Sequence, residues 1–320
     1  MNSVRAYRDI RDSVGRRDRS MHDKTMSLAE AAALVPDGAS LGIGGSIMSR
    51  TPMAMIWQLI KSGRRNLNVS RSMMSTDGDW VVGSGIADRI ETSWCAQGIS
   101  WGLSKVARDR FETGAVVYEE WSHLAMGQRY HAGAMGVPFM PMRTVIGSDL
   151  ERLAAGKVGR STCPFTGEEV LLVPALNPEV AIIHVQRCDR FGNAQIDGLP
   201  FMDIDLACAA DRVILTTEEI VSTEQIRRAP ERTRIPFFCV EAVVDVPFGS
   251  APHECFGLYE PMMRHLDRYV ARANSDPRSG FEALMTELVH EPADWTQFLE
   301  RIGVAELVEA MGRGRSIYRD

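Results

Sequence analysis

The sequence predicts an α/β protein with a layered, mainly parallel sheet flanked by helices, followed by a helical C-terminal tail. From residue 27 onward, short apolar runs alternate with amphipathic segments and with Gly, Pro and Asp, which is the pattern of α/β folds. Several of the apolar runs are rich in β-branched residues and apolar on both faces, as strands covered by helices on each side must be. The 320 residues, 45% of them hydrophobic and 24% charged, suit one large domain or two small ones.

The first elements are predicted from their end signals. Residues 27–35 should form a helix, because Ser27 and Glu30 have the spacing of a capping box. Residues 39–45 predict a strand that runs into a glycine turn, and a proline at the first position opens a helix over 52–61. Further strands are expected at 67–69, 90–95, 115–119, 171–173, 180–185, 213–217 and 237–246, with helices near 102–111, 123–135, 203–210 and 223–229.

The chain is expected to have three parts. Residues 1–24 mix seven Lys/Arg with four Asp and have almost no apolar periodicity, which predicts a flexible tail. Residues 25–275 should form the α/β domain, with a joint between two sub-regions near 150–170, where Gly and Pro gather. Residues 276–320 should form a helical C-terminal extension, because most of this stretch has an amphipathic helical pattern.

Composition argues against several classes of function. A formal net charge of -6 and a pI near 5.7 do not suggest the broad basic surface that binds nucleic acid. No apolar run approaches the roughly 20 residues of a membrane helix, and the amino terminus lacks the apolar core of a secretory signal, so a cytoplasmic location is expected. The six cysteines are scattered without a C-x-x-C pair, so neither a disulfide framework nor a bound metal is expected.

The glycine turn after the first strand is the most informative stretch. Gly44 and Gly45 let the backbone approach a ligand closely, and successive N–H groups near a helix start can hold an anion or an oxyanion. A tight turn without any ligand is the alternative. Arg50 either faces solvent or clamps a substrate carboxylate with two parallel hydrogen bonds. Ser46 either donates its hydroxyl to a ligand or widens a pocket.

At this turn the sequence resembles a known family. Residues 37–52, DGASLGIGGSIMSRTP, are similar to the α signature of the class I CoA-transferases, a family with the NagB/RpiA/CoA-transferase type of fold. That signature usually has Phe and Gly where this chain has Ser46 and Arg50, and an Arg at the second place resembles the branch containing the A-type subunit of glutaconate CoA-transferase. The resemblance to glutaconate-type A subunits continues over residues 180–198, 218–230 and 235–260.

The resemblance implies a shared active site. Family members transfer CoA through a glutamate that lies in a Ser-Glu-Asn-Gly-like motif of the β subunit, and no such motif occurs in this chain. A β-type partner is therefore expected, in a heterodimer or an α2β2 assembly, with an apolar interface around residues 120–150. An acyl-CoA thioester is expected as substrate and no bound cofactor is expected. This chain would supply part of the acyl pocket and of the oxyanion site, including Gly44, Gly45, Ser46 and Arg50.

A second place implied by the resemblance is the turn between residues 118 and 123. Glu119 aligns with a family Glu as a supporting group, His123 aligns with a Gln that resembles an oxyanion donor, and Ser122 lies beside them as a substrate-binding candidate. Ring-opening hydrolases of steroid catabolism resemble this branch but have a carboxylate at the place of His123. A histidine can donate to an oxyanion or, when neutral, take a proton from water. From its position alone, without the family resemblance, His123 at the start of a helix would be interpreted as a capping or surface residue.

Three functions follow from these observations. The first is the α subunit of a CoA-transferase that works through a glutamyl-CoA intermediate on the partner. The alternative on the same scaffold is a ring-opening hydrolase of CoA thioesters, as in steroid or aromatic catabolism. The alternative of another class is a non-catalytic ligand-binding or scaffold subunit, since a fold does not fix a function.

Overall fold

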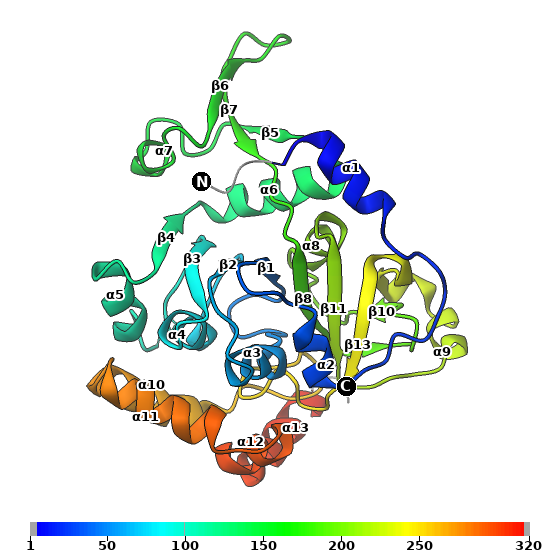
Figure 1. Ribbon diagram of the computed structural model, residues 1–320, viewed down its shortest axis with the longest axis vertical. Coiled ribbons are helices and arrows are strands. Elements are labelled where there is room, and N and C mark those ends of the chain that lie inside the picture. Colours follow the sequence, from blue (N-terminus) through cyan, green and yellow to red (C-terminus); the bar gives the residue numbers. More distant parts are fainter. Residues whose placement is uncertain (1–4, 99, 317–320) are drawn as a thin grey trace.

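Seven parallel strands form the central sheet of the protein (Figure 1). The computed structural model describes residues 5–98 and 100–316. Every neighbouring pair in this sheet is parallel, which confirms the predicted fold class. In spatial order the strands are β13 (Val240–Asp245), β11 (Arg212–Thr217), β8 (Val180–Val185), β1 (Ser40–Ile43), β2 (Leu67–Ser70), β3 (Ala87–Thr92) and β4 (Val117–Glu120).

Helices cover both faces of the sheet, and the strands divide their side chains between two cores. In β8, Val180 and Ile182 belong to one core, whereas Ala181, Ile183 and Val185 belong to the other. This is the period-two alternation of a strand that is buried on both faces. The first core contains α2 (Leu28–Ala33), α3 (Met53–Lys61), α4 (Thr76–Gly83) and α5 (Lys105–Glu112), and the second contains α6 (His123–Met135) and α8 (Asp203–Ala209).

The predicted elements of the main domain are largely present. Ser27 caps α2 in a complete capping box with Glu30, and Pro52 directly precedes α3. The helix predicted over residues 123–135 has those bounds in the structure. Helix α4 was not predicted, and its residues are buried all round, so they lack the amphipathic period that marks a surface helix.

Two small antiparallel sheets accompany the main sheet. The stretch expected to be a joint lies in an arm that projects from the body, at the top of Figure 1. This arm contains β5 (Phe139–Met142), α7 (Asp149–Leu153), β6 (Gly159–Thr162) and β7 (Glu169–Pro174). The other small sheet and its neighbours comprise β9 (Arg187–Cys188), β10 (Ala194–Gln195), α9 (Thr223–Arg227), η1 (Pro230–Arg232), β12 (Thr233–Ile235) and η2 (Phe237–Cys239).

Both ends of the chain carry helices. The segment expected to be a flexible tail contains α1 (Tyr7–Gly15), with Ile10 buried and Arg5 bonded to Asp211 at 2.6 Å; residues 1–4 lie outside the described part. The predicted division into three parts therefore stays a prediction. The expected C-terminal extension starts after α10 (Met263–Ser275) and contains α11 (Ser279–Met285), η3, a π-helix (Thr286–His290), α12 (Trp295–Ile302) and α13 (Val304–Ser316); residues 317–320 lie outside the described part.

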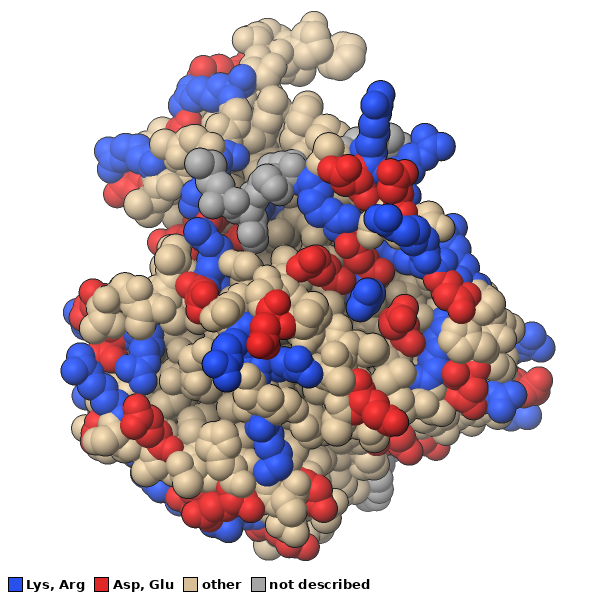
Figure 2. Space-filling model, viewed as in Figure 1, with Lys and Arg blue, Asp and Glu red and all other residues tan. Residues whose placement is uncertain are grey.

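The C-terminal helices share the core of the sheet. The Trp57 and Trp295 rings meet edge to face at a centroid distance of 6.0 Å, and the Trp57 indole N–H donates to the carbonyl of Leu288 at 3.0 Å. Within residues 5–98 and 100–316, no helix combines the length and apolarity needed to cross a membrane. Acidic and basic side chains are intermingled on the face shown in Figure 2.

Candidate functional site

The loops that follow β1, β2, β3 and β4 meet at the carboxyl edge of the sheet. The Ile47 N–H donates to the carbonyl of Met73 at 3.2 Å, which joins the first loop to the second. The Met74 N–H donates to the carbonyl of Trp94 at 2.8 Å, and the Trp121 N–H donates to the carbonyl of Thr92 at 3.1 Å. This edge is where parallel α/β sheets bind their ligands, so it is the candidate functional site.

The glycine turn is a closed loop that protrudes from β1. The N–H of Ser46 donates to the carbonyl of Ser49 at 3.1 Å, and the N–H of Ser49 returns a bond to Ser46 at 2.9 Å. Gly45 has a φ of +70°, and a Cβ placed on it would lie 2.4 Å from the carbonyl oxygen of Ser49. Only glycine therefore fits at position 45.

The backbone N–H groups of this turn are bonded within the protein. The N–H of Gly44 donates to Ile182, and the N–H of Gly45 donates to Asp203 Oδ1 at 2.7 Å. The N–H groups of Ser46, Ile47, Ser49 and Arg50 also have backbone partners. The geometry thus differs from the expected anion cradle, because Gly44 and Gly45 shape the turn but do not point free donors at a ligand.

Arg50 lies inside the protein and holds the turn in place. Its guanidinium is fully buried, forms an ion pair with Asp203 at 2.5 Å, and donates to the carbonyls of Leu199 at 2.9 Å and His184 at 3.2 Å. Asp203 begins α8, so the ion pair ties the turn to the second helical layer. A substrate carboxylate would have to displace Asp203 to reach this guanidinium, which the geometry does not favour.

Two buried serines lie at this edge, and the hydroxyl of one of them has no partner within the described residues. Ser46 follows β1 and Ser72 follows β2; the Oγ of Ser72 is buried without a hydrogen bond. A buried hydroxyl without a hydrogen bond is destabilising, so such groups point to a ligand or to a role in chemistry. Sequence reasoning selected Ser46 but missed Ser72, although its place two residues after a parallel strand was a usable signal.

His123 pairs with the serine that follows β3. Its Nδ1 lies 3.4 Å from Ser93 Oγ, and that hydroxyl donates its single proton to the carbonyl of Ser72 at 2.5 Å. Ser93 Oγ can then only accept, so the pair favours the tautomer with the proton on Nδ1 and a free lone pair on Nε2. His123 is exposed at the first position of α6 and is thus open to a ligand or to a second protein.

Glu119 and Ser122 have structural partners close to His123. Glu119 accepts from Arg89 at 2.9 Å, Lys157 at 2.8 Å and the Trp121 indole at 2.9 Å. Burial acts to raise the pKa of Glu119, but Lys157 and the other donors outweigh it and hold the pKa below its ordinary value. The Oγ of Ser122 caps α6 by accepting from the N–H of Ala125 at 3.1 Å. Both residues thus position the start of α6.

Glu254 borders the glycine turn on its other side and was not selected from the sequence. Its N–H donates to the carbonyl of Met48 at 2.9 Å, and its carbonyl accepts from the N–H of Arg50 at 2.9 Å. Burial raises the pKa of its carboxyl group, against a hydrogen bond with Ser49. Glu254 therefore adds a titratable group to this edge of the sheet.

One group of possible metal ligands lies deeper in the protein. The ligand atoms of His184, Glu218 and Cys255 lie within 4.8 Å of one another. Glu218 already accepts from His184 at 2.7 Å, from Tyr259 at 2.5 Å and from the N–H groups of Phe248 at 2.7 Å and Gly249 at 3.1 Å. The carboxylate is saturated with donors, which suits a hydrogen-bonded core better than a metal site.

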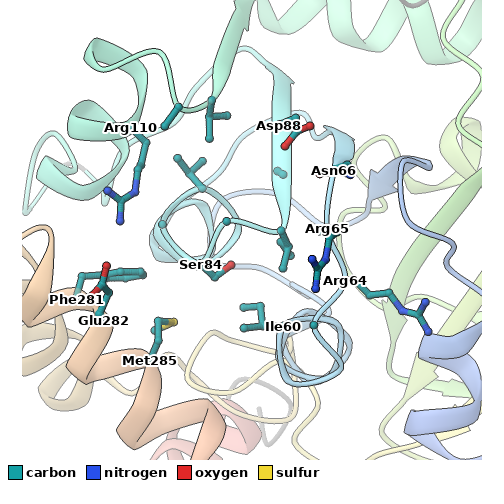
Figure 3. Close-up of a pocket in the computed structure, with 18 of the residues that line it drawn as sticks. Ile60, Arg64, Arg65, Asn66, Ser84, Asp88, Arg110, Phe281, Glu282 and Met285 are labelled. Atoms are coloured by element: carbon teal, nitrogen blue, oxygen red, sulfur yellow. The ribbon is translucent and has the colours of Figure 1, made fainter.

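A cavity of about 750 Å³ lies at the opposite, amino edge of the sheet. In Figure 3, Arg65 and Arg110 stand on opposite sides of it and the side chain of Arg64 points away. Asp88 and Glu282 also line this cavity, so charges of both signs face it. It is separate from the serine and histidine groups described above.

Comparisons with known proteins decide the family. The family described as Coenzyme A transferase matches residues 25–246. The chain belongs to the coenzyme A transferase family. The matched region contains the glycine turn, Ser72 and the pair of Ser93 and His123, whereas Glu254 lies beyond it.

Relatives within the coenzyme A transferase family cover most of the chain. It is 32% identical to the A-type subunit of glutaconate CoA-transferase from Acidaminococcus fermentans over 304 residues, or 89% of this chain and 93% of that one. The crystal structure of that enzyme superposes with a TM-score of 0.83 at 31% identity, covering 90% of this chain and 95% of that one. The A-type subunit of 3-oxoadipate CoA-transferase from Pseudomonas knackmussii is 31% identical over 281 residues, covering 87% and 97%. The cholesterol ring-cleaving hydrolase IpdA subunit of Mycobacterium tuberculosis is 27% identical over 258 residues, covering 77% and 87%.

Proposed function

We propose that this chain is the A-type subunit of a heteromeric enzyme that transfers CoA between an acyl-CoA and a carboxylic acid. The observation that carries the proposal is the similarity to the A-type subunit of glutaconate CoA-transferase, which extends over 89% of this chain and 93% of the relative. The sheet edge supports it through the unpartnered hydroxyl of Ser72 and the buried Ser46 on the adjoining loop, because an oxyanion needs donors that are already in position.

The proposed mechanism divides the chemistry between two subunits. A glutamate of the partner attacks the thioester carbonyl, and collapse of the tetrahedral oxyanion releases the CoA thiolate and leaves an acyl-glutamyl anhydride. The thiolate then attacks the glutamyl carbonyl, so that the acyl group leaves as a carboxylate and glutamyl-CoA remains. The same steps in reverse order load the second acid. Ser46 and Ser72 donate to the oxyanions, and His123 is a further donor at the rim when both of its ring nitrogens carry a proton.

Transfer is tested with the chain co-expressed with its β-type partner, as a heterodimer or an α2β2 complex. The complex is incubated with an acyl-CoA and acetate, and chromatography follows the appearance of acetyl-CoA. Borohydride should reduce the glutamyl thioester and inactivate the complex only after acyl-CoA is added, with the modified residue on the partner. Full turnover by the purified single chain would contradict the proposal.

Hydrolysis is the second candidate, and the geometry of His123 favours it. A free lone pair on Nε2 can take a proton from a water molecule, which a glutamine at this place cannot do. The similarity to a ring-cleaving hydrolase subunit is compatible with this use of the scaffold. Incubation in ¹⁸O-labelled water separates the two functions. Hydrolysis places one label in a ring-opened product that retains its thioester, whereas transfer yields a new acyl-CoA.

A further inference from the structure

We infer that the acyl group handled at this sheet edge is neutral and apolar, without a second carboxylate. The inference rests on the proposed function, since it concerns the substrate of the same site. It bears on a role considered for Arg50 from the sequence, which was to clamp a substrate carboxylate.

The first argument is that the loops at this edge offer a substrate no exposed positive charge. The loops that follow β1 to β4 span residues 44–52, 71–75, 93–104 and 121–122, and they contain only two Lys or Arg residues, Arg50 and Arg71. Both guanidinium groups are fully buried. No arginine or lysine of these loops is therefore exposed to a substrate.

The two arginines are also bonded to acceptors inside the protein, although the buried Nε of each has no partner within the described residues. Arg50 is held by Asp203 and by the carbonyls of Leu199 and His184. Arg71 pairs with Asp77 and donates to the hydroxyl of Thr51 at 3.0 Å. A carboxylate buried at this edge would lose its hydration without gaining a cation, which strongly disfavours its binding.

The basic residues beneath the edge are paired as well. Arg129 of α6 lies 2.8 Å from Glu91, and its guanidinium stacks on the Trp121 ring at a distance of 4.0 Å from the centroid. Arg89 is bonded to Glu119. Arg129 and Arg89 are thus each paired with a carboxylate, and Arg89 shares its carboxylate with Lys157.

The second argument is the apolar character of the loop tips. Ile47 and Trp94 are each 38% exposed, and their loops are joined by the backbone bonds that run through Met73 and Met74. Ile47 directly follows Ser46 in the chain, and the loop of Trp94 is bonded to Met74, two residues after Ser72. An acyl chain that leads away from a carbonyl at Ser46 and Ser72 would therefore run over apolar surface.

The test compares two thioesters of the same length with the complete complex. Pentanoyl-CoA and glutaryl-CoA differ only by a terminal methyl or carboxylate, and kcat/KM is measured for each with acetate as acceptor. We expect pentanoyl-CoA to be preferred on the order of 100-fold, because desolvation of an unpaired carboxylate is strongly unfavourable. Equal or better use of glutaryl-CoA would overturn the inference.

A binding measurement separates this inference from the proposed function. Calorimetric titration of the same complex with both thioesters reports the preference even where no transfer occurs. A preference for pentanoyl-CoA without turnover would support the apolar site and refute transfer. Binding of glutaryl-CoA as tight as that of pentanoyl-CoA, or no binding of either, would overturn the inference.

A charged variant tests the location assigned to the acyl chain, and a neutral variant of similar length is its matched control. Met73→Arg places a guanidinium at a half-buried position of the loop after β2 and should raise kcat/KM for glutaryl-CoA at least about 10-fold relative to pentanoyl-CoA. Met73→Gln has a similar length without charge and should leave the preference unchanged. An unaltered ratio in Met73→Arg would contradict the location assigned to the acyl chain.

Discussion

Arg50 and Asp203 form an ion pair at 2.5 Å in which neither side chain has more than 1% of its surface exposed. Arg50 has a φ of +51°, in the left-handed region that favours glycine. The class I signature usually has glycine at this place. Here the strained backbone turns the guanidinium inward, where Asp203 holds both Arg50 and the N–H of Gly45. One carboxylate thus fixes both ends of the glycine turn.

Replacing Arg50 by glycine should destabilise the protein although it restores the usual residue. The variant relieves about 1 kcal/mol of backbone strain, but it leaves a buried carboxylate without its counter-ion at a cost of about 3–5 kcal/mol. The free energy of unfolding in urea should fall by about 2–4 kcal/mol. The double variant Arg50→Gly, Asp203→Asn should recover more than half of this loss. Arg108→Ala, which removes an exposed pair with Glu112, is the control with a change below about 0.5 kcal/mol.

His123 variants of the co-expressed complex should separate the two roles of this side chain. If His123 donates to an oxyanion, His123→Ala should lower kcat about 100-fold and His123→Gln only several-fold, because an amide still donates. If His123 is a base, both variants should lose activity equally, since an amide accepts no proton. His131→Ala is the matched control on the same helix, because His131 is exposed and pairs with Asp205. Unchanged kcat in His123→Ala would remove the residue from the site.

The fold was predictable from the sequence because local signals agreed with the tertiary structure. The strands on either side of the glycine turn have apolar runs bounded by Gly and Pro, and α6 begins at a serine cap. Helix α4 escaped prediction because it is enclosed on all sides, so its residues show no helical period. Helix α1 escaped because its charged composition outweighs the buried side chain of Ile10.

The site was only partly predictable, for a different physical reason. The glycine turn and His123 lie at element boundaries, which the sequence marks. The partner of Arg50 is 153 positions away in the chain, and no local pattern shows that a left-handed residue would aim its side chain at α8. Ser72 and Ser93 become site candidates only in the folded protein, because the parallel sheet brings together loops that are separate in the sequence.

Acid should destabilise the protein through His253. This residue is buried between the hydroxyls of Thr51 at 2.8 Å and Thr76 at 2.7 Å, and burial lowers its pKa from 6.5 to about 4. Above pH 6.5 the shift has no effect. Between pH 6.5 and 4 the His253 imidazole binds a proton in the unfolded chain but not in the folded chain. The free energy of unfolding therefore falls by about 3 kcal/mol as the pH is lowered.

The pH dependence is measured as the difference between the protein and a His253→Gln variant. Urea unfolding from pH 7.5 to 4 should give a difference that shrinks steadily below pH 6.5, because glutamine does not titrate. The subtraction is needed because burial raises the pKa of Asp79 to about 6, which has the opposite effect, favouring the folded state as the pH falls from 6 toward 4. A difference that is constant with pH would show that His253 does not titrate as stated.

Ser46→Ala and Ser72→Ala should reduce catalysis without reducing stability. The buried hydroxyl of Ser72 lacks a partner in the described structure, so its removal should leave the free energy of unfolding unchanged or raise it by up to about 1 kcal/mol, and removal of the Ser46 hydroxyl should have a similarly small effect. In the complex with the partner, loss of one oxyanion donor should lower kcat at least about 10-fold with little change in KM. Ser62→Ala, at an exposed serine after α3, is the control for both measurements. A parallel loss of stability and activity would show that the hydroxyls are structural, and would remove the oxyanion site from this edge of the sheet.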